Sequence, residues 1–292
     1  MTTGQKNARF LSLLGLVFIS VQLARLSNAA EPTGLRTRLA TIVSLEFDDA
    51  SHTLWKATAT SLARSRDEGR TWIPVAFPVT AKGDIAAVSI SAGSAKTIYV
   101  SVAGSGVWRS QDGGRTWASR NRGLPATTVV TLDAHSGLAR TVFAYIAGKG
   151  IFRSQNAGAS WHLVDRGPRE TVVQLVHSSM PSGIGTGWLF AATRQGVRRT
   201  MDCFCGWHNA GRLATDLRVV ATDVDWRERV YTAGREGLII SPDGGDDWIR
   251  MASPVALITA LVSTPSGKLY GAMNGHLIRS PDRGVTWDYV DG

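Results

Sequence analysis

The sequence predicts an all-β protein formed by a single six-bladed β-propeller, in which each blade is a four-stranded antiparallel sheet. Two observations lead to this prediction. An eight-residue pattern, Ser-x-Asp-x-Gly-x-Thr-Trp, returns six times at intervals of 39 to 46 residues, a length that accommodates four short strands and their turns. Short runs rich in β-branched residues also recur at similar distances before the copies, as expected for strands.

Within each repeat we expect the strands in a constant order. Apolar runs such as 41–45, 129–132, 172–176 and 257–262 predict the innermost strands. An aromatic residue stands 10 or 11 residues before each pattern and marks the second strand: Trp55, Tyr99, Phe143, Phe190, Tyr231 and Tyr270. A glycine opens the third strand in four repeats: Gly106, Gly150, Gly196 and Gly237. The fourth strand follows the pattern.

We call the copies of the pattern the box loops; they span 65–72, 110–117, 154–161, 200–207, 241–248 and 280–287. An Asp or Asn at the third position can accept main-chain N–H groups and close a tight turn. Glycine at the fifth position permits a positive φ, and Trp at the eighth supplies an apolar plug under the loop. These residues are therefore predicted to be structural: Asp67, Trp72, Asp112, Trp117, Asn156, Trp161, Asp202, Trp207, Asp243, Trp248, Asp282 and Trp287.

The fourth box loop departs from the pattern, because Cys203 and Cys205 flank Phe204 where a glycine is expected. The two cysteines could form a local disulfide in an oxidising compartment or remain free thiols. With His208 they would be one ligand short of a closed zinc site. We therefore predict no metal site, and the absence of nucleotide-binding glycine motifs predicts no cofactor.

The N-terminal residues resemble a secretory signal peptide. Lys6 and Arg9 precede an apolar run over 10–24, and small residues follow at Ser27 and Ala29. We predict a signal peptide over 1–29 and the propeller over 30–292, so that the protein is exported to the periplasm or the cell exterior; an uncleaved anchor is the alternative. Only five residues follow the last box loop, too few for a comfortable outer strand, so residues 34–40 could complete the sixth blade. Alternatively, 31–38 form a flexible leader.

The net charge of +9 does not by itself indicate a nucleic-acid partner. Of 32 basic residues 26 are Arg, and they are spread along the chain without the basic stripe and interleaved aromatics of a nucleic-acid binder. We predict no nucleic-acid partner. For an exported monomer, the expected partners are a protein or an anionic glycan.

One set of arginines does follow the repeat. An Arg stands directly before the box loop in five of the six repeats. In a ring these side chains would occupy equivalent positions, either as a basic band that binds carboxylates or as stems packed between blades with their heads on neighbouring carboxylates or carbonyls. The candidate binding residues are Arg64, Arg109, Arg153, Arg199 and Arg279.

The box loops resemble the Asp box, or bacterial neuraminidase repeat, over essentially all of 30–292. This repeat is found in sialidases, xyloglucan-degrading glycosidases, sortilin-type receptors and the photosystem II stability/assembly factor family. The runs 106–117, 121–125 and 275–287 are most similar to the assembly-factor and xyloglucanase-like branch. The resemblance implies a propeller with the boxes on the outer rim and with binding on an axial face. It also implies a non-catalytic scaffold for a protein client, which in the assembly factors is a membrane protein.

Catalysis is the alternative, and it would be glycoside hydrolysis. The sialidase Arg-Ile-Pro signature is absent, and Tyr99, Tyr231 and Tyr270 belong to the structural aromatic column. A pair of carboxylates facing each other across the ring could still serve as acid and base. Carboxylates near the inner strands are Glu46, Asp84, Asp133, Asp223 and Asp225, of which Glu46, Asp133 and Asp225 are the weak catalytic candidates. Solvated rim carboxylates are the alternative for all of them.

Overall fold

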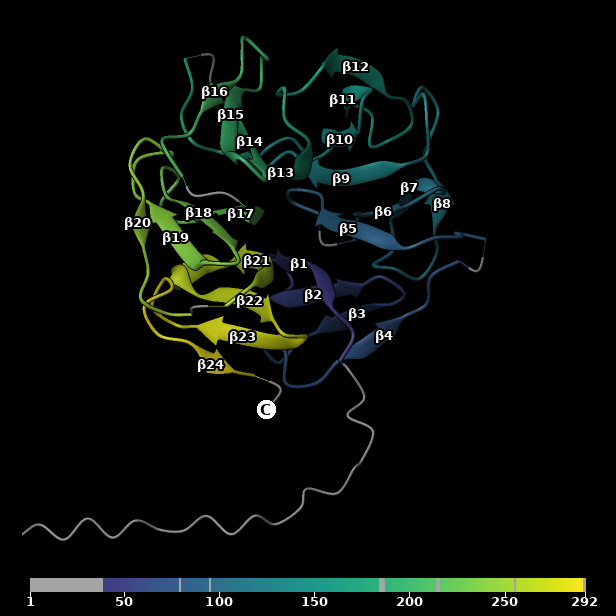
Figure 1. Ribbon diagram of the computed structural model, residues 1–292. Helices are drawn as coiled ribbons and strands as arrows, with labels where there is room; N and C mark the ends of the chain where they lie inside the picture. Colours follow the sequence, from purple (N-terminus) through teal and green to yellow (C-terminus); the bar gives the residue numbers. More distant parts are fainter. Residues whose placement is uncertain are drawn as a thin grey trace, which may run out of the picture. The chain divides into compact units, whose positions relative to one another are not determined.

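The computed structural model describes residues 39–290 except 79, 95, 184–186, 214–215 and 255. These residues belong to one compact unit, Arg38–Gly292, and form six four-stranded antiparallel sheets arranged as blades around a common axis (Figure 1). The predicted signal peptide lies outside the described residues. The prediction of a six-bladed, all-β propeller is confirmed.

Each blade uses four strands that are consecutive in sequence. Blade 1 comprises β1 Ile42–Asp48, β2 Thr53–Thr58, β3 Leu62–Ser65 and β4 Ile73–Val75. Blade 2 comprises β5 Ile85–Ile90, β6 Ile98–Val102, β7 Gly106–Ser110 and β8 Ala118–Ser119. Blade 3 comprises β9 Val129–Ala134, β10 Val142–Ile146, β11 Gly150–Ser154 and β12 His162–Asp165. Blade 4 comprises β13 Val172–Ser178, β14 Trp188–Thr193, β15 Gly196–Met201 and β16 His208–Asn209. Blade 5 comprises β17 Leu217–Thr222, β18 Val230–Gly234, β19 Gly237–Ser241 and β20 Ile249–Arg250. Blade 6 comprises β21 Ile258–Ser263, β22 Leu269–Met273, β23 His276–Ser280 and β24 Asp288–Tyr289.

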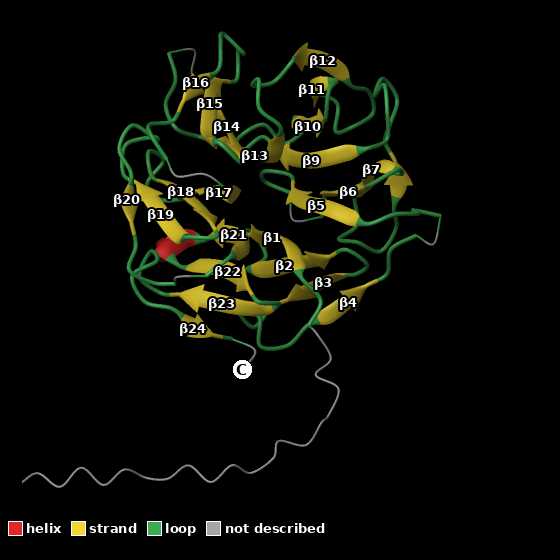
Figure 2. Cartoon of the chain, in the orientation of Figure 1, coloured by secondary structure: helices red, strands yellow, loops and turns green. Residues whose placement is uncertain are grey.

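The strand order expected from the repeat is the observed one. The predicted inner runs overlap β1, β9, β13 and β21, and four third strands begin at the predicted glycines. All six aromatic residues of the predicted column lie in second strands and are at most 2% exposed. Helix is confined, within the described ranges, to the single 3-10 turn η1 Pro265–Gly267, drawn red in Figure 2. No helix there is long and apolar enough to cross a membrane.

Within the part of the chain that the structure describes, the ring closes between blades 6 and 1 without an exchanged strand. The inner strands contact one another in a cycle, from β1 through β5, β9, β13 and β17 to β21 and back to β1. The expectation that the C-terminus is too short for an outer strand is wrong, because β24 pairs with β23 as the fourth strand of its own blade. Two residues suffice because outer strands are equally short in blades 2, 4 and 5. Residues 34–38 lie outside the described chain, and 39–40 are not in a strand.

The two ends of the propeller axis carry different connections. The loops between first and second strands lie beside the box loops, since Ala157 N donates to Arg140 O at 2.8 Å; we call this end the loop face. At the other end, the turns between second and third strands lie beside the connections between blades. The hydroxyl of Ser105 donates to Lys82 O at 2.6 Å, and that of Thr127 to Gly104 O at 2.9 Å. We call this end the turn face.

Apolar packing joins neighbouring blades as well as the strands within each blade. The core cluster around Tyr99, for example, contains residues of blades 2 and 3 together with Trp161. The box-loop tryptophans contribute across these boundaries rather than only plugging their own loops. Trp161 Nε1 donates to Arg120 O at 2.7 Å, and Trp248 Nε1 donates to Ala210 O at 2.8 Å, in each case to the connection that precedes its blade.

Candidate functional site

The axis of the propeller contains a cavity of about 370 Å³ at the turn-face end. Its wall consists mainly of side chains and main chain from the inner strands, which converge on the axis (Figure 1). Apolar residues such as Val43, Leu132 and Leu175 form much of the wall. Two carboxyl groups, those of Glu46 and Asp133, also line the cavity. The structure thus brings together two of the three weak catalytic candidates, from β1 and β9.

Asp133 is buried and hydrogen-bonded to both neighbouring blades. Its Oδ1 accepts from the Ser89 hydroxyl at 3.0 Å, and its Oδ2 accepts from His177 N at 2.6 Å. Donors of this kind favour the carboxylate, but loss of hydration opposes ionisation more strongly. Burial therefore raises the pKa of Asp133 to about 7.

Glu46 occupies the equivalent position in β1. No hydrogen-bond donor for its carboxyl group is present among the described residues. Burial raises the pKa of Glu46 well above its ordinary value, and the charge of Asp133 raises it further. Because two buried carboxyl groups that share a cavity wall resist double ionisation, the pair retains a proton above the pH at which isolated carboxyl groups lose theirs.

A second cavity of about 280 Å³ lies toward the loop face and shares Glu46 and Asp133 with the first. His135, His177 and Asp223 belong to its wall. A small ligand in either cavity could therefore contact the two carboxyl groups.

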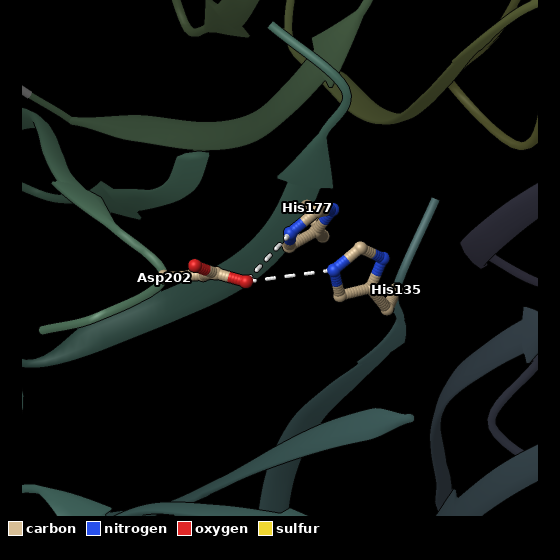
Figure 3. A group of neighbouring side chains, drawn as sticks. All are labelled: His135, His177 and Asp202. Carbon is tan, nitrogen blue, oxygen red and sulfur yellow. Dashed lines mark ion pairs between the residues drawn. The ribbon is translucent and has the colours of Figure 1, made fainter. Parts of the chain in front are cut away.

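His135, His177 and Asp202 form a buried cluster near this second cavity, drawn in Figure 3. The two imidazole rings stack with centroids 3.7 Å apart. Both Nε2 atoms point toward Asp202 Oδ2, at 3.5 Å from His135 and 3.9 Å from His177. Burial lowers the pKa of His135, and burial together with the charge of His135 lowers that of His177 to about 3. Both rings are consequently neutral near pH 7.

The hydrogen bonds of these rings argue against metal binding. His135 Nδ1 accepts from Gly137 N at 3.0 Å and Leu138 N at 3.1 Å, and His177 Nδ1 accepts from Ser136 N at 3.2 Å. A neutral imidazole whose Nδ1 accepts must carry its proton on Nε2. The Nε2 atoms that face Asp202 therefore present protons rather than the lone pairs a metal ion requires. The three side chains therefore form a polar contact between blade 3, which carries His135, and blade 4, which carries His177 and Asp202.

The third catalytic candidate, Asp225, does not line either axial cavity. Its Oδ2 accepts from Ser266 N at 2.8 Å and lies 3.6 Å from Arg283 Nη2. Asp223 lines the second cavity, but its Oδ2 accepts from the Tyr231 hydroxyl at 2.6 Å. Asp84 is exposed in the connection before β5. Asp225 and Asp223 thus hold loops together at the boundary of blades 5 and 6.

The arginines that precede the box loops extend toward the following blade. Arg64 Nη1 donates to Gly113 O at 3.2 Å, and Arg109 Nη1 donates to Ala157 O at 2.6 Å. In both cases the acceptor is the fourth residue of the next box loop. This geometry corresponds to the stem-between-blades alternative, and none of the five arginines is fully exposed.

The same arrangement continues around the ring with variations. Arg199 Nη1 donates to Gly244 O, and Arg279 Nη1 donates to Glu68 Oε2 at 2.9 Å, which joins blade 6 to blade 1. Blade 5 has Ile240 in place of the arginine, and there Arg283 of the sixth box loop reaches back to Asp223 and Asp225. Arg153 is half-buried near the histidine cluster. Burial is the main cause of the lowered pKa of His135; Asp202 acts in the opposite direction, and the positive charge of Arg153 lowers this pKa further.

Five box loops form the hydrogen bonds that their residue types predict. In the second loop, Ser110 Oγ donates to Asp112 Oδ1 at 2.8 Å and accepts from Gly114 N at 2.8 Å. Asp112 also accepts from Thr116 N at 2.8 Å and from the Thr116 hydroxyl at 2.6 Å. These donors, the Thr116 hydroxyl first, lower the pKa of Asp112 to about 2. The role of this residue is to close the loop.

The fourth box loop is closed by a disulfide. Cys203 and Cys205 are bonded, with Cα atoms 5.4 Å apart, so the disulfide alternative holds and neither thiol is free. Phe204 between them has φ of 56°. The bonded sulfurs are unavailable for the partial zinc site with His208.

One feature of the surface had no signal in the linear sequence: a concentration of positive charge on the turn face. Among the described residues, its turns and connections expose eight basic side chains and two acidic ones, Asp84 and Glu236, while Glu170 and Asp216 are half-buried there. The basic residues are Lys82, Arg122, Lys149, Arg166, Arg169, Arg194, Arg212 and Arg235. They lie on four interblade connections and on the turns between second and third strands of three blades, and only the ring brings them to one end of the axis. The histidine cluster was missed for the same reason, since its members are up to 67 residues apart.

Comparison with known proteins supports the fold and leaves the function open. No family model and no curated protein sequence matches the chain. Among solved structures, YCF48 from Cyanidioschyzon merolae has a TM-score of 0.58 and 16% identity, with 87% of this chain and 86% of that chain covered. YCF48 bound to a D1 peptide has a TM-score of 0.57 and 19% identity, covering 87% and 83%.

The GH74 xyloglucanase from Xanthomonas campestris is also similar, with a TM-score of 0.54 and 21% identity. The match covers 85% of this chain but only 37% of the enzyme, so the chain corresponds to a little over a third of that protein. At these identities the comparisons show a shared β-propeller fold. The activity of either relative does not follow from them.

Proposed function

We propose that this protein is an exported, non-catalytic binding propeller that engages a protein client on its turn face. The observation that carries the proposal is the excess of exposed basic residues on the turn face, eight against two acidic among the described residues, at the end of the axis where the first cavity lies. Clustered positive charge attracts carboxylate-rich partners and accelerates their association. The client class is therefore an acidic, extended polypeptide segment, free or attached to a membrane protein.

The propeller offers the bound segment both basic side chains and an adjoining apolar cavity. Interblade hydrogen bonds, such as the one from the Ser105 hydroxyl to Lys82 O, hold the turns of this face in place, and Arg169 and Arg194 are exposed on it. The adjoining cavity, with its apolar wall, can take one side chain of the bound segment. The similarity to YCF48, whose structure is known with a D1 peptide, is consistent with peptide binding by this type of propeller.

The test is affinity capture from detergent-solubilised envelope of the source cells at low and high salt. We expect a protein retained at low salt and released at high salt, because exposed charge pairs are screened. The variant Arg169→Glu/Arg194→Glu should lose the protein, whereas Arg70→Glu/Arg115→Glu, which makes the same charge change in box loops of the loop face, should retain it. Equal capture by both variants would contradict the proposal, and recovery of carbohydrate alone would favour the glycan-binding alternative.

Glycoside hydrolysis remains a second candidate because Glu46 and Asp133 share one cavity wall. In such an enzyme the general acid must be protonated near neutral pH while its partner is ionised. The raised pKa values of Glu46 and Asp133 allow one of them to stay protonated near neutral pH. Hydrolysis of xyloglucan oligosaccharides, abolished by both Glu46→Gln and Asp133→Asn in folded variants, would establish this function. Absence of hydrolysis over a panel of glucans and sialosides would exclude it for those substrates.

A further inference from the structure

We propose that the Cys203–Cys205 disulfide is a thiol–disulfide exchange site, reduced and reoxidised in the folded propeller by thiols of small molecules or proteins. Both cysteines are exposed at the surface of blade 4, so an attacking thiolate can reach the sulfur atoms. Exposed and strained disulfides are the ones that exchange readily, whereas buried structural disulfides resist reduction.

Strain in this loop is visible in the main chain of Phe204. The five other box loops have glycine at this position with φ between 80° and 98°. Phe204 has φ of 56°, and a bulky residue disfavours this left-handed region. The disulfide joins the residues on either side of Phe204, so the ring it closes contains the residue that opposes the loop conformation.

The main-chain N–H at the fifth position of the fourth loop has a different partner from the one in the other loops. The first residue of this loop is Thr200, whose hydroxyl donates to Met201 O at 3.1 Å. Phe204 N donates to Met201 O at 2.8 Å, whereas the corresponding glycine N in the other loops donates to the serine hydroxyl. The disulfide takes the place of the hydrogen bond to the serine hydroxyl, so its reduction removes a covalent constraint and leaves residues 203–205 held by the Phe204 N–Met201 O hydrogen bond and by the packing of Phe204.

Reduction is expected to act beyond the loop through the aromatic contacts of Phe204. The Phe204 and Phe143 rings pack edge to face with centroids 6.1 Å apart. Phe143 stacks on His177 with centroids 5.7 Å apart, and His177 lies in the wall of the loop-face cavity. Release of Phe204 from its left-handed conformation would therefore loosen one side of the packing around the histidine cluster.

The exchange itself needs two thiols. A thiolate attacks one cysteine sulfur, forms a mixed disulfide and expels the other cysteine as a thiolate, which takes up a proton. A second external thiolate then attacks the external sulfur of the mixed disulfide and expels the first cysteine as a thiolate, which also takes up a proton. Two electrons pass from the two external thiols, which become a disulfide, to the protein disulfide, which becomes two protonated cysteines.

The test is a redox titration of the full, folded chain in dithiothreitol and glutathione buffers. Free cysteines are trapped with a maleimide and counted by intact mass, while near-UV circular dichroism reports folding and chymotrypsin reports cleavage after Phe204. We expect both thiols to appear with the native spectrum retained and with new cleavage at Phe204. The double variant Cys203→Ser/Cys205→Ser should fold and show the same cleavage without reductant.

Phe204→Gly is the matched variant for strain, because glycine adopts the left-handed conformation without the penalty. Its disulfide should be roughly fivefold to thirtyfold harder to reduce at equilibrium. The proposal fails if thiols appear only when the near-UV spectrum is lost, if the double serine variant does not fold, or if Phe204→Gly leaves the reduction equilibrium unchanged.

Discussion

The guanidinium group of Arg109 donates from Nη1 to the carbonyl oxygen of Ala157 at 2.6 Å, across the boundary between blades 2 and 3. Arg109 is only 9% exposed, and its Nη2 also donates to Gln111 at 2.8 Å. An arginine held in this way stabilises the ring both through its charge-assisted hydrogen bond and through the apolar part of its stem. The contact joins two repeats that no local sequence feature pairs.

Replacing Arg109 by alanine should lower the free energy of unfolding by about 1–3 kcal/mol, because a buried carbonyl loses its donor and the stem leaves a void. Urea denaturation followed by tryptophan fluorescence measures this change. Arg66→Ala, at an exposed position of a box loop, is the control and should change stability by no more than about 0.5 kcal/mol. Equal effects of the two substitutions would contradict a clamping role for Arg109.

Glu46→Gln should change how stability depends on pH. The raised pKa values of Glu46 and Asp133 mean that the folded state holds protons more tightly than the unfolded chain. For Asp133 this stabilisation is complete below about pH 4, the unfolded pKa, and is lost as the pH rises through about 7; for Glu46 it is lost as the pH rises through the raised pKa of that group. The variant removes one member of the pair. The stability of the variant minus that of the parent should therefore be more favourable at pH 8 than at pH 5.

Thermal unfolding at these two pH values tests this expectation. The control is Asp84→Asn, which neutralises an exposed carboxylate. Its difference from the parent should be nearly the same at pH 5 and pH 8. If Glu46→Gln and the parent show the same pH dependence, the two carboxyl groups do not share a proton in the folded state.

A box-loop aspartate should contribute to stability in the opposite pH range. Hydrogen bonds from Thr116 lower the pKa of Asp112 to about 2, so its stabilisation is present above the unfolded pKa of about 4 and is lost as the pH falls toward 2. Asp112→Asn retains an acceptor, as Asn156 does in the third loop, and should show a smaller loss of stability between pH 4 and pH 2. Asp112→Ala should be less stable at every pH. Acid unfolding curves for the three proteins distinguish these outcomes.

His177 should make the folded protein less stable in mild acid than at neutral pH. Burial and the charge of neighbouring His135 lower its pKa to about 3, whereas an unfolded histidine titrates near 6.5. The unfolded state therefore binds the proton first, and stability falls as the pH drops below 6.5 toward 3. His177→Gln should lose less stability between pH 7 and pH 5 than the parent. The exposed control His208→Gln should follow the parent, and an unchanged His177→Gln slope would indicate that His177 does not stay neutral in the fold.

The repeat made the architecture predictable because it depends on local chemistry. A serine, an aspartate and a glycine at fixed spacing close the same loop wherever they occur, and an aromatic residue 10 or 11 positions earlier lies in the second strand each time. The number of blades and the strand order follow from these local rules. The short last strand did not follow, because the length of β24 depends on pairing with β23 and not on the residues that remain after Trp287.

The candidate sites depended on closure of the ring. Glu46 and Asp133 are 87 residues apart in the chain, and they share a cavity only because the inner strands of all blades converge on one axis. Asp225 lies beyond the end of its inner strand, where Ala221 occupies the position equivalent to Asp133, and it pairs with Arg283 outside that cavity. The direction of the five arginines and the gathering of basic side chains on the turn face were likewise set by the packing of blade against blade. Local spacing determines which turn a segment forms, whereas distances between repeats arise only when burial of their apolar faces brings the repeats together.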